Sequence, residues 1–223
     1  MPGLKRWFPD VRFDGNRVTP DEIDSYDMVQ VMHPSTSATW FGTTAAGTAG
    51  QAKAYVVINK YADYPRNLAG AVAGSSDLGG TWVLNGKDQF GVSITETITV
   101  GTAANGGTTD GTKVFSSVTS GTFTFATASL GSGTPRLGAV TTGTSVLFGL
   151  PYKIASVDDI KFITWINNGT PTTLNGGTVQ SSTYVDTTAH AFRGSATVAL
   201  TDRYVVWMKS SFNNENGVNL AAM

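Results

Sequence analysis

The sequence WVLNGKDQFG at residues 82–91 runs without a break into VSITETI at residues 92–98, and this is the clearest structural signal in the chain. Both ends of the stretch are rich in β-branched, aromatic and aliphatic residues, which favour strands. Between them, the side chains of Asp88 and Gln89 can bond their own backbone, and Gly91 can adopt a left-handed conformation. The stretch therefore predicts a strand, a tight turn and a second strand.

The second strand of this hairpin alternates clearly between two kinds of residue. Ile94, Glu96, Ile98 and Val100 fall on one face, and threonines fall on the other. A carboxylate among aliphatic side chains is unusual. We expect this face either to lie at the edge of a sheet or to meet another subunit.

Similar β-prone runs recur after residue 50, among Asn-Gly and Asp-Gly dipeptides that accept the backbone angles of tight hairpin turns. No helical pattern alternates with these runs, which argues against a parallel α/β sheet. We predict an all-β fold, with an antiparallel, hairpin-rich body like a sandwich or jelly roll. Strands are expected at residues 53–61, 81–84, 92–100, 113–125, 144–148, 160–166, 178–185, 196–200 and 204–209, with a loop at 101–111.

The N-terminal part of the chain differs from the rest in its charge. Ten charged residues lie between positions 5 and 27, whereas Arg136 is the only one between positions 114 and 152. We therefore predict an N-terminal arm over residues 1–40 and a β-rich body over residues 41–223, with a subdivision near 150 left open. Thr19-Pro20-Asp21-Glu22 has the form of a capping box and predicts at most one short helix in the arm.

The overall composition excludes several classes of function. Only 14% of the residues are charged, the net charge is −1 and there is no cysteine. A neutral chain lacks the charge that attracts nucleic acid, so we expect no nucleic-acid partner. Without cysteine there is no disulfide scaffold, thiolate metal site or cysteine nucleophile. The apolar runs are too short to span a bilayer and no signal peptide is visible, so we expect a soluble protein with no membrane partner.

Few residues are available for chemistry. His33 and His190 are the only histidines, and neither has metal-ligating neighbours at a recognised spacing. Asp158-Asp159 is interpreted as a turn before a strand. The glycine-rich residues 131–138 lack the following helix of a phosphate-binding loop, so we interpret them as a flexible loop. We predict no enzyme activity, no metal site and no cofactor.

Aromatic residues are the best candidates for contacts with a partner. Trp82, Trp165 and Trp207 lie within apolar strands, which favours a place in the core. Exposed aromatics in a hydrophilic arm are costly unless something covers them, so the arm either stays solvated or becomes ordered on a partner. The predicted contact residues are Lys5, Arg6, Trp7, Phe8, Arg12, Phe13, Trp40 and Phe41.

Residues 80–210 resemble the virion structural proteins that tailed bacteriophages encode near their major capsid protein. The resemblance is carried by three stretches: residues 85–98 with 113–118, residues 148–156, and residues 192–196 with 202–207. Modules of this kind are reused in phage heads, tails and fibres. Within them, the sequence is most similar to a capsid decoration protein, also called a cement or head auxiliary protein.

The resemblance implies a non-enzymatic protein that coats and stabilises the capsid by bridging major capsid protein subunits. It implies a homo-oligomer, with a trimer favoured, located on the capsid surface of the virion after assembly in the host cytoplasm. An arm of 35 residues at roughly 3.3 Å per residue could reach about 115 Å, far enough to cross to a neighbouring subunit. The alternatives are a head fibre, neck or tail protein, or a surface glycan-binding β protein.

Overall fold

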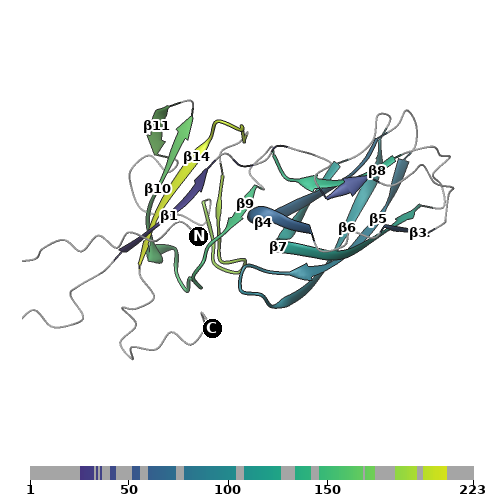
Figure 1. Cartoon of the computed structure of the whole chain (residues 1–223), viewed down its shortest axis with the longest axis horizontal. Coiled ribbons are helices and arrows are strands. Elements are labelled where there is room, and N and C mark those ends of the chain that lie inside the picture. The colour runs from purple at the N-terminus through teal and green to yellow at the C-terminus, as the bar shows by residue number, and fades with distance from the viewer. Residues whose placement is uncertain are drawn as a thin grey trace, which may run out of the picture.

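The fold is known from a computed structural model, which describes residues 26–32, 34, 36, 41–43, 52–55, 60–73, 78–103, 108–126, 134–141, 146–167, 169–173, 184–194 and 198–209. Within these residues nearly all regular structure is β-strand, and the strands pair antiparallel in two sheets. The two sheets lie toward opposite ends of an elongated molecule (Figure 1). This confirms the predicted all-β, antiparallel class.

The smaller sheet has four strands in the order β1-β14-β10-β11. Its bounds are β1 (Tyr26–Met32), β10 (Ile160–Asn167), β11 (Thr170–Thr173) and β14 (Arg203–Lys209). The first and last described strands of the chain are therefore neighbours, and residue Val29 pairs with Val206. Residues 26–32, which we had assigned to a separate arm, instead form a strand of this sheet.

The larger sheet has ten strands and curls into a half-barrel (Figure 1). Its main path is β12-β13-β9-β4-β7-β5-β6, with β2, β3 and β8 attached beside it. The bounds are β2 (Gly42–Thr43), β3 (Ala52–Tyr55), β4 (Lys60–Ala73), β5 (Leu78–Lys87), β6 (Ser93–Ala103), β7 (Thr108–Phe125), β8 (Thr134–Ala139), β9 (Leu147–Gly149), β12 (Val185–Asp186) and β13 (Ala191–Arg193).

The predicted hairpin is present as β5 and β6. Asp88 Oδ1 accepts hydrogen bonds from the backbone N–H groups of Phe90 and Val92, both at 2.8 Å, and Gly91 has a φ of 80°. The turn is thus built from the residues that the sequence indicated. The Asn85-Gly86 dipeptide, in contrast, lies inside β5 and not in a turn.

The strand β7 is longer than predicted and contains a bulge. Asn67 of β4 pairs with Val114 and Ala69 pairs with Asp110, so residues 111–113 of β7 face the single residue Leu68. A bulge leaves backbone groups of the longer strand without partners in the ladder. In this protein, two side chains from other strands take over those hydrogen bonds.

Glu96 of β6 is the first of these two side chains. Its Oε1 accepts hydrogen bonds from the backbone N–H of Thr112 at 2.6 Å and of Lys113 at 3.1 Å. The carboxylate is 8% exposed and lies so close to Gly111 that a Cβ there would be 2.6 Å from Oε2. The face that carries Glu96 therefore points into the half-barrel, where the carboxylate joins the edge strand β6 to the bulge of β7. We had expected this face to lie at the edge of a sheet or to meet another subunit; β6 is the last strand of its sheet, and the face packs within its own chain.

Replacing Glu96 should loosen the link between β6 and β7. We expect Glu96→Ala to lower the free energy of unfolding by about 2 kcal/mol, because the bulge loses its acceptor. Glu96→Gln keeps an oxygen at the same place and should cost about 1 kcal/mol, the difference between a charged and a neutral acceptor. Urea denaturation measures both. Equal losses for the two variants would contradict this role, since only glutamine retains the acceptor.

Two large clusters of buried residues form most of the core, and a third, small one consists of Val114, Leu147 and Ala191. One fills the half-barrel and includes Trp82, Phe115 and Phe123. The other lies between the two sheets, where Phe148 of β9 stacks on Phe192 of β13 and contacts Tyr204 of β14, with centroids 5.3 Å apart in both pairs. The chain near residue 150 thus marks the change from one sheet to the other, although β12 and β13 return to the larger sheet.

Several other predictions are decided by the structure. A short 3-10 helix at Val157–Asp159, capped by Ser156, precedes β10, so the predicted turn at Asp158-Asp159 is confirmed. Residues 134–138, interpreted as a flexible loop, belong to β8, because they pair with β4. The predicted loop at 101–111 is shorter, since residues 101–103 and 108–111 are in strands. Residues 198–200 are not a strand, and the predicted helix start at Thr19 lies outside the described residues.

Candidate interaction surface

The predicted contact residues lie mostly outside the described part of the chain. This applies to Lys5, Arg6, Trp7, Phe8, Arg12, Phe13 and Trp40, and also to His33. Phe41 is described, and it is 1% exposed within the core of the half-barrel. Its backbone N–H donates to the carbonyl of Leu137 at 3.0 Å. The prediction that Phe41 contacts a partner is therefore wrong, because its side chain is already buried within its own chain.

The outward face of the smaller sheet carries an apolar surface that the sequence analysis did not identify. The register places Met28, Trp207 and Phe162 side by side on β1, β14 and β10. Two residues further along, Gln30, Val205 and Thr164 form the next row, followed by Met32, Arg203 and Ile166. We call this surface the open face and define it by its apolar members Met28, Met32, Phe162, Ile166, Val205 and Trp207.

These apolar side chains are accessible to solvent to an unusual degree. Met28 is 41% exposed, Met32 42% and Phe162 38%, and Trp207 is half-buried. The rings of Phe162 and Trp207 are 5.7 Å apart. We had placed Trp207 in the core, but strand alternation turns it outward, while Trp82 is fully buried and Trp165 packs against the core between the sheets.

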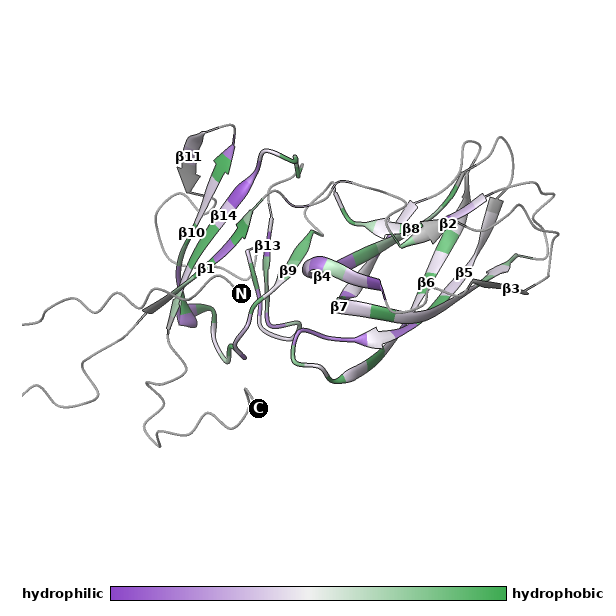
Figure 2. Ribbon diagram, viewed as in Figure 1, coloured by the Kyte–Doolittle hydropathy of each residue, from purple (hydrophilic) through white to green (hydrophobic). Residues whose placement is uncertain are grey.

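Alternation along β1 explains why the described residues cover only one face of the smaller sheet. Val29 and Val31 point inward and pack in the core between the sheets, whereas Met28, Gln30 and Met32 point outward. Figure 2 shows hydrophobic residues at intervals along β1, β10 and β14. The period-two pattern over residues 28–32 was the available signal. It was obscured because both of its faces are largely apolar.

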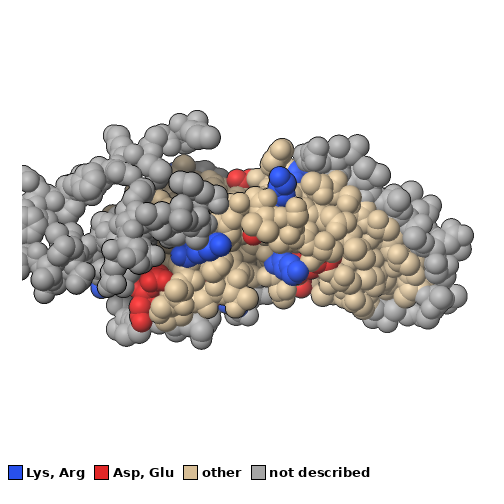
Figure 3. Space-filling model, turned by 90° about the horizontal axis from the view of Figure 1, so that it is seen from below, with Lys and Arg blue, Asp and Glu red and all other residues tan. Residues whose placement is uncertain are grey.

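Among the described residues, the side of the molecule shown in Figure 3 carries a few separate groups of charged side chains. On the open face, Arg203 is the exposed cation, and Gln30 and Thr164 are neutral polar residues. Contiguous exposed apolar residues on a soluble protein mark a place where something else binds. The open face therefore has the character of an interaction surface.

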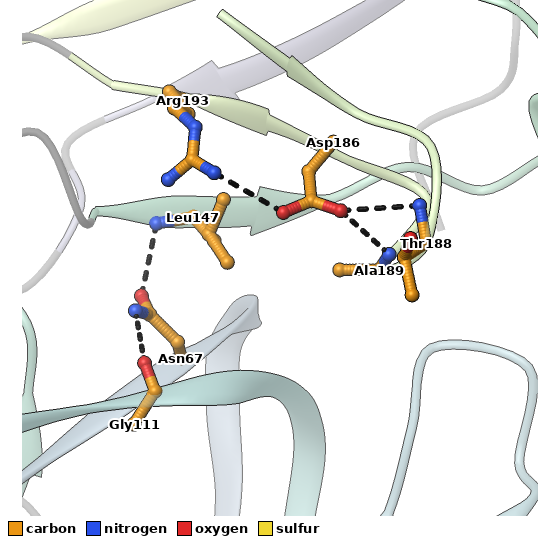
Figure 4. Close-up of polar contacts among 7 residues, drawn as sticks. All are labelled: Asn67, Gly111, Leu147, Asp186, Thr188, Ala189 and Arg193. Atoms are coloured by element: carbon orange, nitrogen blue, oxygen red, sulfur yellow. Dashed lines mark hydrogen bonds and ion pairs between the residues drawn. The ribbon is translucent and has the colours of Figure 1, made fainter. Parts of the chain in front are cut away.

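The polar groups near the junction of the two sheets have structural roles. Asn67 donates through Nδ2 to the carbonyl of Gly111 at 2.8 Å and accepts through Oδ1 from the N–H of Leu147 at 2.9 Å (Figure 4). Asp186 pairs with Arg193 at 3.2 Å, and its other oxygen accepts from the N–H groups that follow it in the turn (Figure 4). These bonds join β4 to β7 and β9, and β12 to β13, within the larger sheet.

Buried ionisable groups are also engaged within the chain. Arg66 is fully buried, donates to the carbonyl of Val140 at 2.7 Å and lies over the ring of Phe148 at 5.0 Å. Burial lowers the pKa of Arg66, and Asp63, 3.6 Å away, opposes this shift.

Two further groups bond to the backbone. Asp202 accepts from the N–H of Ala199, and His190 Nδ1 lies 3.1 Å from the carbonyl of Ile154. Among the described residues, no three His, Asp or Glu side chains are grouped so as to hold a metal ion.

Comparisons with protein families, with curated proteins and with solved structures return no match to this chain. The described residues contain no helix that is long and apolar enough to cross a membrane. The fold and the open face define an all-β protein with an apolar sheet surface that the described residues leave uncovered.

Proposed function

We propose that this protein is a non-enzymatic structural component of a phage virion, which decorates and stabilises the capsid by bridging major capsid protein subunits. The observation that carries the proposal is the open face: an apolar surface on a sheet whose other side is packed into the core. Such a surface suits attachment to another protein, because apolar contact area is the main source of affinity in protein association.

The shape of the molecule supports a bridging role. The half-barrel and the smaller sheet lie at opposite ends (Figure 1), so a partner on the open face leaves the half-barrel available for a second contact. The half-barrel itself presents Val83 and Val92, which are 40% and 57% exposed. The resemblance of residues 80–210 to virion structural proteins supports the same proposal, as does the low fraction of charged residues.

The number of copies in a purified virion tests the proposal. A decoration protein should be present at a copy number comparable with that of the major capsid protein, and particles lacking it should lose their DNA at a lower temperature. Quantitative mass spectrometry of virions and a thermal release assay measure these two properties. A few copies per particle would instead identify a neck, tail or fibre protein, and absence from the particle would overturn the proposal.

One observation favours the alternative of a surface glycan-binding protein. The neighbouring rings of Phe162 and Trp207 lie on the open face, and aromatic rings can stack on sugar rings. Screening the protein on a glycan array, with Trp207→Ala as the control variant, tests this alternative. Binding that is lost in Trp207→Ala would support it, and absence of binding on an array that includes bacterial surface polysaccharides would exclude it.

A further inference from the structure

We propose that the open face is covered, in the free protein, by the N-terminal segment of the same chain, through residues 7–13. This inference concerns the isolated protein and does not depend on the proposed role in a virion. It follows from the size of the open face, from its position next to the start of β1 and from the sequence of the segment.

The size of the open face fits a single extended segment. The face spans three strands, and β1 and β14 are each seven residues long. With strands about 4.8 Å apart and roughly 3.3 Å per residue, its footprint is roughly 300 Å². A stable interface between two folded proteins needs about 800 Å² on each partner. The open face is therefore smaller than a complete interface with a folded partner and would form only part of one, whereas one extended segment of about seven residues covers its whole length.

The sequence of residues 7–13 (WFPDVRF) has the alternation of such a segment. Trp7, Val11 and Phe13 fall on one side of an extended chain, together with Pro9, while Phe8, Asp10 and Arg12 fall on the other. The side with Trp7, Val11 and Phe13 would pack on the open face, and the other side, which carries both charges and Phe8, would face away from it. Pro9 has no N–H and can pair with a strand on one side at most, which favours packing across a face over insertion into a sheet.

The position of the segment in the chain favours its own open face over that of a neighbour. Met28 lies two residues after Tyr26, where β1 begins. Residues 14–25 connect the segment to β1 and could span about 40 Å at roughly 3.3 Å per residue, more than enough to fold back over the sheet. A tethered segment also acts at a high effective concentration. Covering the face in this way would keep the free protein from associating through it.

Chemical cross-linking of the full-length chain tests the proposal directly, because the protein contains no cysteine of its own. Asp10→Cys and Gln30→Cys place one thiol on the segment and one on the open face, and a short bis-maleimide joins thiols that approach each other. The matched control replaces Gln30→Cys with Val83→Cys, at an exposed position of the half-barrel. All variants should unfold at the same urea concentration as the natural chain.

We expect the Asp10–Gln30 pair to form an intramolecular cross-link with a yield at least tenfold above that of the Asp10–Val83 pair. Adding Met28→Asn and Met32→Asn, which remove two anchors of the open face, should reduce the yield to that of the control pair. Equal yields for the two pairs would overturn the proposal. Cross-linked dimers without the intramolecular product would overturn it as well, and would identify a second copy as the occupant.

Discussion

Asn67→Asp is expected to lower the free energy of unfolding by about 4 kcal/mol at neutral pH, the effect of leaving an uncompensated charge in a buried site. Asparagine and aspartate side chains have nearly the same shape, so the substitution alters the charge and the hydrogen-bonding groups and leaves the packing unchanged. Asn67 is fully buried and serves both as a donor, to the carbonyl of Gly111, and as an acceptor, from the N–H of Leu147. A carboxylate can only accept, so it would face the Gly111 carbonyl without a proton between them.

The stability lost in Asn67→Asp should become smaller at low pH. Burial raises the pKa of the introduced carboxyl above its ordinary value, because it disfavours the charged form. The neutral form can again donate to Gly111. The stability that the protonated carboxyl supplies is fully present below the pKa of aspartate in the unfolded chain, about 3.9. It is lost as the pH rises through the higher pKa of this carboxyl in the folded protein. The difference from the natural chain should therefore narrow between pH 7 and pH 4.

Urea denaturation of both proteins at pH 7 and pH 4 measures this effect. Asn85→Asp is the matched control, because Asn85 is an exposed asparagine in β5 whose side chain bonds to Ser120 and Thr95. We expect Asn85→Asp to cost less than about 1 kcal/mol at either pH. If Asn67→Asp behaved in the same way as Asn85→Asp, the bonds of Asn67 would not hold the bulge of β7 to β9.

Phe148→Ala is expected to cost about 4 kcal/mol, within the range for removing a buried phenylalanine. Phe148 is fully buried in the core between the two sheets. Its ring contacts Phe192 and Tyr204, and the guanidinium of Arg66 lies over it. Removing the ring leaves a cavity in which the buried guanidinium of Arg66 loses one of its neighbours.

The same substitution on the open face provides the control. Phe162 is 38% exposed, so Phe162→Ala should cost about 1 kcal/mol or less. Both variants are measured by urea denaturation, followed by tryptophan fluorescence and by far-ultraviolet circular dichroism. Similar losses for Phe148→Ala and Phe162→Ala would show that the packing between the sheets contributes little to stability.

Much of the fold could be predicted from local sequence. The turn at residues 88–91 was predictable because Asp88 bonds to backbone groups only two and four residues away, and Gly91 supplies the left-handed angle on its own. The alternation in β6 also correctly predicted that Ile94, Glu96, Ile98 and Val100 share one face of the strand. Signals of this kind depend on residues that are close in the sequence, so they can be interpreted without the tertiary structure.

Other features depend on residues far apart in the sequence. The role of Glu96 depends on a bulge in β7, and that of Asn67 depends on both β7 and β9. The short strands β8 and β13 carry weak local signals and exist because β4 and β9 pair with them. Phe41 is apolar and aromatic, which suits a contact surface and a core equally, and only packing decides between the two.

The sequence by itself determined that this protein is built from antiparallel strands, because strand propensity, alternation and turn chemistry act over a few residues. Only the tertiary structure decided which apolar face the other described residues leave uncovered. Residues 26–32 are apolar on both sides, and pairing of β1 with β14 turns Val29 and Val31 into the core while Met28 and Met32 face outward. The open face is therefore a product of strand pairing between the two ends of the described chain, which no local pattern encodes.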